Sequence, residues 1–192
     1  IVGVLEEIYK NTEDFEKLIN IYKKAVEICE IFDEKKVYYQ KIITIFIEKT
    51  NQLVLAIPYI EEIISNEPQI AENYEMFENV LEKLNNFYKL DEIFQKEYDN
   101  ISDTTRKEQV LYLKAVNAKQ RLEDYDICIF ALQTLLEANP YNEAGLKYLE
   151  SLLSIEEAII PAGKVLSNIY EILYKWENLV DVLILILNQN PE

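Results

Sequence analysis

Apolar positions recur along this chain in a pattern that predicts helices. Five times an apolar residue follows a polar turn, with mostly small or apolar residues standing three, seven and ten positions further on. These offsets lie on one face of a helix with 3.6 residues per turn. The opening residues are Phe15, Leu53, Leu90, Tyr125 and Trp176. The pattern therefore predicts five amphipathic helices, whose starts are separated by 38, 37, 35 and 51 residues.

Each of these helices is expected to be the second half of a hairpin, because further apolar residues at helical spacing precede most of the opening residues. The copy that opens at Leu90 is the weakest, since its later positions are the polar Glu97 and Asn100. Three copies have a proline fifteen residues after their opening residue, and proline just past a helix end stops the helix. These prolines are Pro68, Pro140 and Pro191.

A sequence period of about 30 to 50 residues is typical of stacked repeat arrays. Three segments carry a more specific resemblance: NQLVLAIPYIEEIISNEP at 51–68, EDYDICIFALQTLLEANPYNEAG at 123–145 and YKWENLVDVLILILNQNPE at 174–192. They resemble tetratricopeptide repeats, which are helix–turn–helix units of about 34 residues. The resemblance extends over nearly the whole chain. It implies an all-α, right-handed solenoid of stacked hairpins with about ten or eleven helices.

The repeat register predicts one domain over residues 1–192. We expect hairpins at about 1–30, 34–68, 70–101, 104–140 and 154–192, with an extra helix at 141–153. The chain begins in mid-helix at Ile1, and its last helix is apolar nearly all round from Leu179 to Leu187. A solenoid normally ends in a helix with a polar outer face. These ends predict a segment of a longer array, and self-association through the apolar C-terminal helix.

The formal net charge of −16 bears on the choice of partner. Nucleic acid is not expected, because its binding depends on Lys and Arg meeting phosphates. A membrane is not expected either, since no run of about 18 apolar residues is present. A cytoplasmic location is the expectation. A basic protein or peptide is the partner that this charge attracts most easily, although the charge also serves solubility alone.

Catalytic chemistry is not predicted. The chain has no histidine, which removes the usual general base near neutral pH and the commonest metal ligand. Cys29 and Cys128 stand 99 residues apart and match no zinc-binding spacing, so we expect them to fill gaps in the core. No glycine-rich phosphate loop is present. We therefore expect no catalytic residue, no metal and no cofactor, and the chain is predicted not to be an enzyme.

The resemblance does imply a binding surface, because the first helix of each tetratricopeptide hairpin lines a concave groove. Carboxylates at helical spacing form one stripe of this face, and asparagine amides can both donate and accept hydrogen bonds. Taken singly, each residue is better explained as part of a solvated groove wall. The predicted groove residues are Glu75, Glu78, Asn79, Glu82, Lys114, Asn117, Arg121, Lys164 and Asn168.

The predicted function is a protein-interaction scaffold that binds a polypeptide partner in this groove. The alternative is a helical accessory or docking domain of a larger enzyme or assembly. A scaffold in RNA processing is a third hypothesis, to which the acidic charge gives no support as a direct RNA binder.

Overall fold

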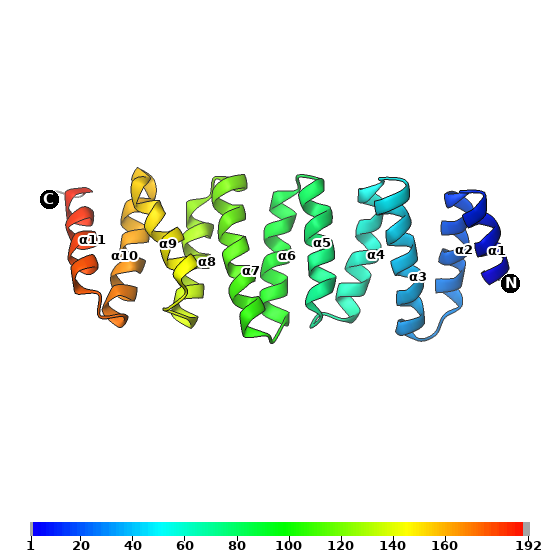
Figure 1. The fold of residues 1–192 in the computed structure, drawn as a ribbon, viewed down its shortest axis with the longest axis horizontal. Coiled ribbons are helices and arrows are strands. Elements are labelled where there is room, and N and C mark those ends of the chain that lie inside the picture. The colour runs from blue at the N-terminus through cyan, green and yellow to red at the C-terminus, as the bar shows by residue number, and fades with distance from the viewer. Residues whose placement is uncertain (1, 190–192) are drawn as a thin grey trace. The chain divides into compact units, whose positions relative to one another are not determined.

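The computed structural model describes residues 2–189, and the regular elements in this part of the chain are all helices, without a strand (Figure 1). The prediction of an all-α protein with ten or eleven helices is confirmed for the described residues. The α-helices are α1 (Val2–Asn11), α2 (Phe15–Ile28), α3 (Phe32–Thr44), α4 (Leu53–Asn66), α5 (Ala71–Lys83), α6 (Phe87–Asn100), α7 (Thr104–Asn117), α8 (Tyr125–Ala138), α9 (Glu143–Ser151), α10 (Glu156–Ile172) and α11 (Trp176–Gln189).

Three short irregular helices continue or follow these elements. Two of them are π-helices that extend α3 and α7, namely η1 (Ile45–Lys49) and η2 (Ala118–Leu122). The third is a 3₁₀-helix after α9, η3 (Leu152–Ser154). No helix among residues 2–189 is long and apolar enough to cross a membrane. The predicted positions Ile1 and Pro191 lie outside the described residues.

The chain forms two compact units, Ile1–Asn86 and Phe87–Glu192. In unit 1, each of the helices α1 to α5 packs against the next one along the chain. The apolar register explains this packing, because Leu18, Tyr22 and Ala25 of α2 are all buried at the offsets that the sequence pattern predicts. Buried aromatic and aliphatic side chains of α4 and α5, such as Ile60 and Phe77, continue the core.

In unit 2, α7 packs between α6 and α8, and α8 contacts both α9 and α10. The core of this unit draws on every helix from α7 to α11. Gly163 of α10 allows α11 to approach closely, since a Cβ atom at this position would lie 2.9 Å from Cδ1 of Ile186. Val182 is the buried residue of α11, and it also lies against Gly163.

One turn geometry recurs before the second helix of every predicted hairpin. Five non-glycine residues have a left-handed backbone with φ between 51° and 56°, and each stands two residues before a helix start. In the same turns a backbone N–H reaches back five or six residues to a carbonyl of the preceding helix, as Lys175 does to Tyr170 at 2.9 Å. The left-handed residues are Glu13, Asn51, Asn85, Glu123 and Tyr174.

This turn corrects the third copy of the sequence pattern. The second helix there begins at Phe87, not at Leu90. The sequence pattern placed this start three residues later, because Leu90 was taken as the opening residue. Counted from Phe87, the offsets of three, seven and ten fall on Leu90, Phe94 and Glu97. All three are buried, so Glu97 occupies a core position of the repeat although it is a carboxylate.

Candidate functional site

The predicted groove residues of unit 1 lie on α5. Glu75, Asn79 and Glu82 are exposed, and Glu78 is half-buried. The Nδ2 group of Asn79 donates a hydrogen bond to the backbone carbonyl of Glu75 at 2.8 Å. We call these four residues the α5 stripe. Glu75, Glu78 and Glu82 stand at helical spacing, so three carboxylates lie on one face of α5.

The predicted groove residues of α7 are not on an open face, and the prediction is wrong for two of them. Lys114 is 7% exposed and Asn117 is 5% exposed. The Lys114 ammonium donates to Oε1 of Gln95 at 2.9 Å and lies 3.4 Å from Oδ2 of Asp91. Asn117 Nδ2 donates to the Phe87 carbonyl at 3.0 Å. This face of α7 therefore packs against α6.

The third residue of this group, Arg121, is exposed in η2, where its guanidinium lies 5.0 Å from the centre of the Phe87 ring. The predicted groove positions on α7 were displaced by one residue along the sequence. One residue corresponds to a rotation of about 100° around the helix axis. The residues that stand 34 positions after the exposed members of the α5 stripe are Gln109, Leu113 and Val116. Gln109 and Leu113 are exposed, so they mark the open face of α7 that the sequence reading missed.

Gln109 and Leu113 also line a cavity of about 490 Å³ in unit 2. Its other walls come from the beginning of α7 and from the start of α9. Glu108 is one of the lining residues, and its carboxylate accepts hydrogen bonds from Asn139 and Asn142 at 2.8 to 3.1 Å. The polar wall of this cavity is therefore engaged in joining α7 to the α8–α9 turn.

The predicted residues of α10, Lys164 and Asn168, are both exposed. They stand four positions apart and so share one face of the helix. Two of the three residues between them, Val165 and Leu166, are buried in the core of unit 2. Exposure of Lys164 and Asn168 agrees with a position on an open surface, and whether this surface binds a ligand stays a prediction.

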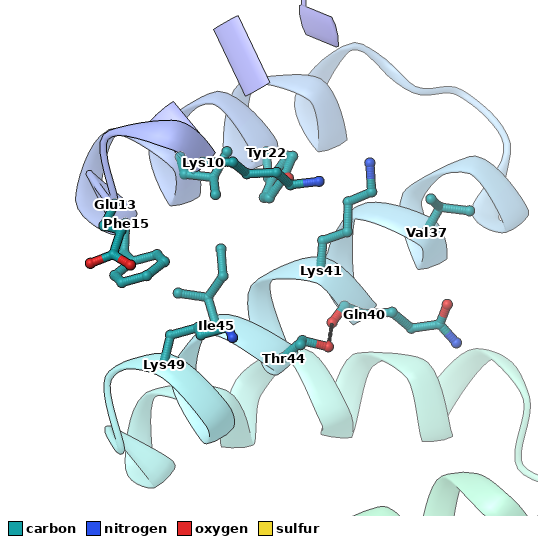
Figure 2. Close-up of a pocket in the computed structure, with 11 residues that line it drawn as sticks. Lys10, Glu13, Phe15, Tyr22, Val37, Gln40, Lys41, Thr44, Ile45 and Lys49 are labelled. Carbon is teal, nitrogen blue, oxygen red and sulfur yellow. Dashed lines mark hydrogen bonds between the residues drawn. The ribbon is translucent and has the colours of Figure 1, made fainter. Parts of the chain in front are cut away.

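A cavity with a mixed polar and apolar lining lies in unit 1, between α1, α2 and α3, and has a volume of about 570 Å³ (Figure 2). In Figure 2 the side chains of Lys10 and Lys41 extend toward each other at one end, while Phe15 and Ile45 lie together at the other. The lining residues are Lys10, Glu13, Phe15, Leu18, Tyr22, Val37, Gln40, Lys41, Thr44, Ile45 and Lys49.

Glu6 holds two of the lysines of this cavity in place. The Lys10 ammonium lies 2.6 Å from Oε1 of Glu6, and the Lys41 ammonium lies 3.0 and 3.1 Å from its two oxygens. Burial opposes ionisation of Glu6, but the hydrogen bonds from both lysines prevail and lower its pKa to about 2. The Lys41 ammonium also lies 5.2 Å from the centre of the Tyr22 ring. The group of two lysines and one carboxylate therefore carries a net positive charge at neutral pH.

This cavity was not predicted from the sequence, although the distribution of lysines is a signal for it. Eight of the nine lysines in residues 1–86 precede residue 50. The sequence pattern assigned Phe15, Leu18 and Tyr22 only to the buried face of a helix. Leu18 and Tyr22 are buried, whereas Phe15 is half-buried and faces the cavity.

The two cysteines are free thiols that lie in different units. Cys128 is fully buried in α8, and burial raises the pKa of its thiol to about 12. Burial also raises the pKa of Cys29. Both thiols are therefore protonated at neutral pH, and the protonated form is the unreactive one.

A search of protein-family models finds no match to this chain, and a search of curated proteins finds no similar sequence.

Proposed function

We propose that the chain is a tetratricopeptide-like scaffold that binds a polypeptide partner, with its hairpins continuing into one right-handed array. The observation that carries this proposal is the left-handed turn residue that precedes α2, α4, α6, α8 and α11 by the same two positions. Repetition of one helix–turn–helix unit supports an array, because each unit needs a neighbour to bury its second apolar face.

The binding face in this proposal is the open face of the first helix of each hairpin. On α5 it carries the α5 stripe, on α7 it carries Gln109 and Leu113, and on α10 it carries Lys164 and Asn168. In an array these faces line the concave side. The three carboxylates of the α5 stripe favour a basic segment of the partner at this position. Such charge complementarity raises the association rate more than it raises the affinity.

Site-specific photo-crosslinking in cell extract tests the proposal. A photoreactive residue at Asn79, Leu113 or Asn168 should capture the same partner from each position, because the three side chains are exposed on first helices. The matched controls are Asp99 and Glu137, which are exposed on second helices and should capture nothing. Equal capture from all five positions, or from none, would contradict the proposed binding face.

The charge of the α5 stripe is tested separately. Replacing Glu75, Glu78 and Glu82 by Gln should weaken the binding of a basic partner and flatten the salt dependence of its association rate. The control is the same change at Glu137 and Glu177, two exposed acids on second helices. An unchanged affinity in the α5 variant would show that the α5 stripe is not part of the binding site. The scaffold function would then still be tested by the crosslinking experiment.

A further inference from the structure

The cavity of unit 1 has the size and the apolar walls of a ligand site. Phe15, Leu18 and Tyr22 follow one face of α2, and Val37 of α3 faces them while remaining 49% exposed. The volume of about 570 Å³ lies inside the range of about 300 to 1,000 Å³ that is usual for ligand pockets. The cavity is therefore large enough for a bulky apolar side chain together with its neighbours in a peptide.

The charge at this cavity is opposite to that of the unit around it. Lys10, Lys41 and Lys49 line it, and the nearby acids are Glu13 in the lining and Glu6 behind it. Three ammonium groups against two carboxylates leave a net positive charge there. Residues 1–86 as a whole hold 9 basic and 17 acidic side chains. The cavity is thus a positively charged site in a unit with a negative net charge, and it attracts an anionic group locally.

Lys49 is the least engaged of the three lysines. Lys10 and Lys41 share the Glu6 carboxylate, whereas Lys49 forms no ion pair with any residue between 2 and 189. It is exposed at the end of η1, at the edge of the cavity that also holds Ile45 (Figure 2). A carboxylate that enters beside Ile45 would therefore find an ammonium group that is not held in an ion pair.

We propose that this cavity binds a short acidic and apolar segment of the polypeptide partner, an inference that rests on the proposed scaffold function. A large aliphatic or aromatic side chain of the segment enters between α2 and α3, and a neighbouring Asp or Glu pairs with Lys49. A long acidic run is disfavoured, because residues 50–86 hold seven acids against one lysine and repel it. The cavity and the α5 stripe select segments of opposite charge.

The test is selection of peptides from a random phage-displayed library on the intact chain, followed by affinity measurements with synthetic copies of the selected peptides. The main variant is Lys49→Glu. Its matched control is Lys24→Glu, which makes the same charge change at an exposed lysine of α2 outside the cavity. A second variant, Val37→Asn, removes apolar surface from the wall without altering charge.

Peptides that place Asp or Glu beside a large apolar residue should be selected. Lys49→Glu should weaken them by roughly five- to tenfold, while Lys24→Glu leaves their affinity unchanged. Val37→Asn should weaken them as well, and circular dichroism should show both variants folded. Selected peptides rich in Lys and Arg that lose affinity only when Glu75, Glu78 and Glu82 become Gln would overturn the cavity assignment and leave the scaffold standing. A library that yields no binding peptide would also overturn the cavity assignment, while the crosslinking result decides on the scaffold.

Discussion

Glu97 of α6 and Arg106 of α7 form a two-pronged ion pair inside unit 2. Nε of Arg106 lies 2.7 Å from Oε1 of Glu97, and its Nη2 atom lies 3.1 Å from Oε2. The Glu97 side chain is fully buried and the Arg106 side chain is 14% exposed. A buried carboxylate is very costly without a partner. The polar residue at this core position of the repeat is therefore stabilised by the next helix of the same unit.

Replacing only Arg106 of this pair should lower the free energy of unfolding much more than replacing both residues. Arg106→Leu leaves the buried Glu97 carboxylate uncompensated and should lower the free energy of unfolding by about 3 to 5 kcal/mol. The double variant Glu97→Leu with Arg106→Leu should recover most of this loss, because two apolar side chains need no pairing. Urea unfolding of the three proteins gives the comparison. A double variant as unstable as Arg106→Leu would contradict this account of the pair.

The sequence predicted the helical class and the starts of α2, α4, α8 and α11, because apolar residues on one helix face report burial directly. The start of α6 was missed for a physical reason. Phe87 fits the apolar spacing of both the preceding and the following helix, and only the left-handed turn at Asn85 separates the two. Glu97 was read as an interruption, because a pattern on one helix does not show that Arg106 arrives from another.

Candidate site residues were harder to predict than the fold. A lysine or asparagine on a helix can be buried when a neighbouring helix supplies a hydrogen-bonding or charged partner for its side chain. Lys114 is buried because Asp91 and Gln95 receive it, and these partners were not recognised from the sequence. The cavity of unit 1 was missed because its walls belong to separate helices, and Phe15 has the same pattern as a core residue.

Acid should destabilise unit 1 through Glu6. Lys10 and Lys41 lower the pKa of Glu6 from its ordinary value of 4.5 to about 2, against the opposing effect of burial. A carboxyl whose pKa is lower in the folded state adds stability above its unfolded pKa, and this stability is lost as the pH falls through its folded pKa. The loss should therefore run from about pH 4.5 down to about 2.

Denaturant unfolding at a series of pH values measures this effect. Glu6→Gln should lower stability at neutral pH and reduce the slope between pH 4.5 and about 2. Glu7→Gln is the matched control, since Glu7 is an exposed neighbour on α1. Identical pH slopes in the wild type and in Glu6→Gln would show that Glu6 is not the group responsible.

The left-handed turn residues store strain that glycine should release. Glu123 has φ 54°, and a left-handed backbone costs a non-glycine residue about 1 to 2 kcal/mol. Glycine avoids this cost but loses about 0.5 to 1 kcal/mol through its greater freedom in the unfolded chain. Glu123→Gly should therefore stabilise unit 2 by about 0.5 to 1 kcal/mol, as measured by thermal unfolding.

The control for this substitution is Gln109→Gly, an exposed position inside α7 where glycine should cost about 1 kcal/mol. The two glycine variants should thus change stability in opposite directions. If both destabilise the protein equally, the backbone at Glu123 does not carry the strain that its φ angle implies.

Self-association should depend on the outward face of α11. Val180, Leu183, Ile184 and Leu187 are exposed there, whereas Ile186 packs against Gly163 of α10. Contiguous exposed apolar side chains favour association. The wild-type chain should therefore associate and bind a hydrophobic dye, and Ile184→Glu with Leu187→Glu should abolish both effects.

Sedimentation velocity and dye fluorescence measure these properties. Asn188→Glu serves as the charge control at an exposed polar position of the same helix. Ile186→Glu should instead destabilise unit 2, because its side chain is packed against α10. A wild-type chain that stays monomeric at high concentration and binds no dye would rule out α11 as an association surface.

Small-angle X-ray scattering of the intact chain tests the central claim, that the hairpins continue into one array, most directly. The variant Ile184→Glu with Leu187→Glu, at low concentration, is the sample that avoids association. A compact domain of 192 residues has a radius of gyration of about 16 Å. The array predicts a radius well above this value and an asymmetric distribution of interatomic distances. A radius near the compact value with a symmetric distribution would contradict it.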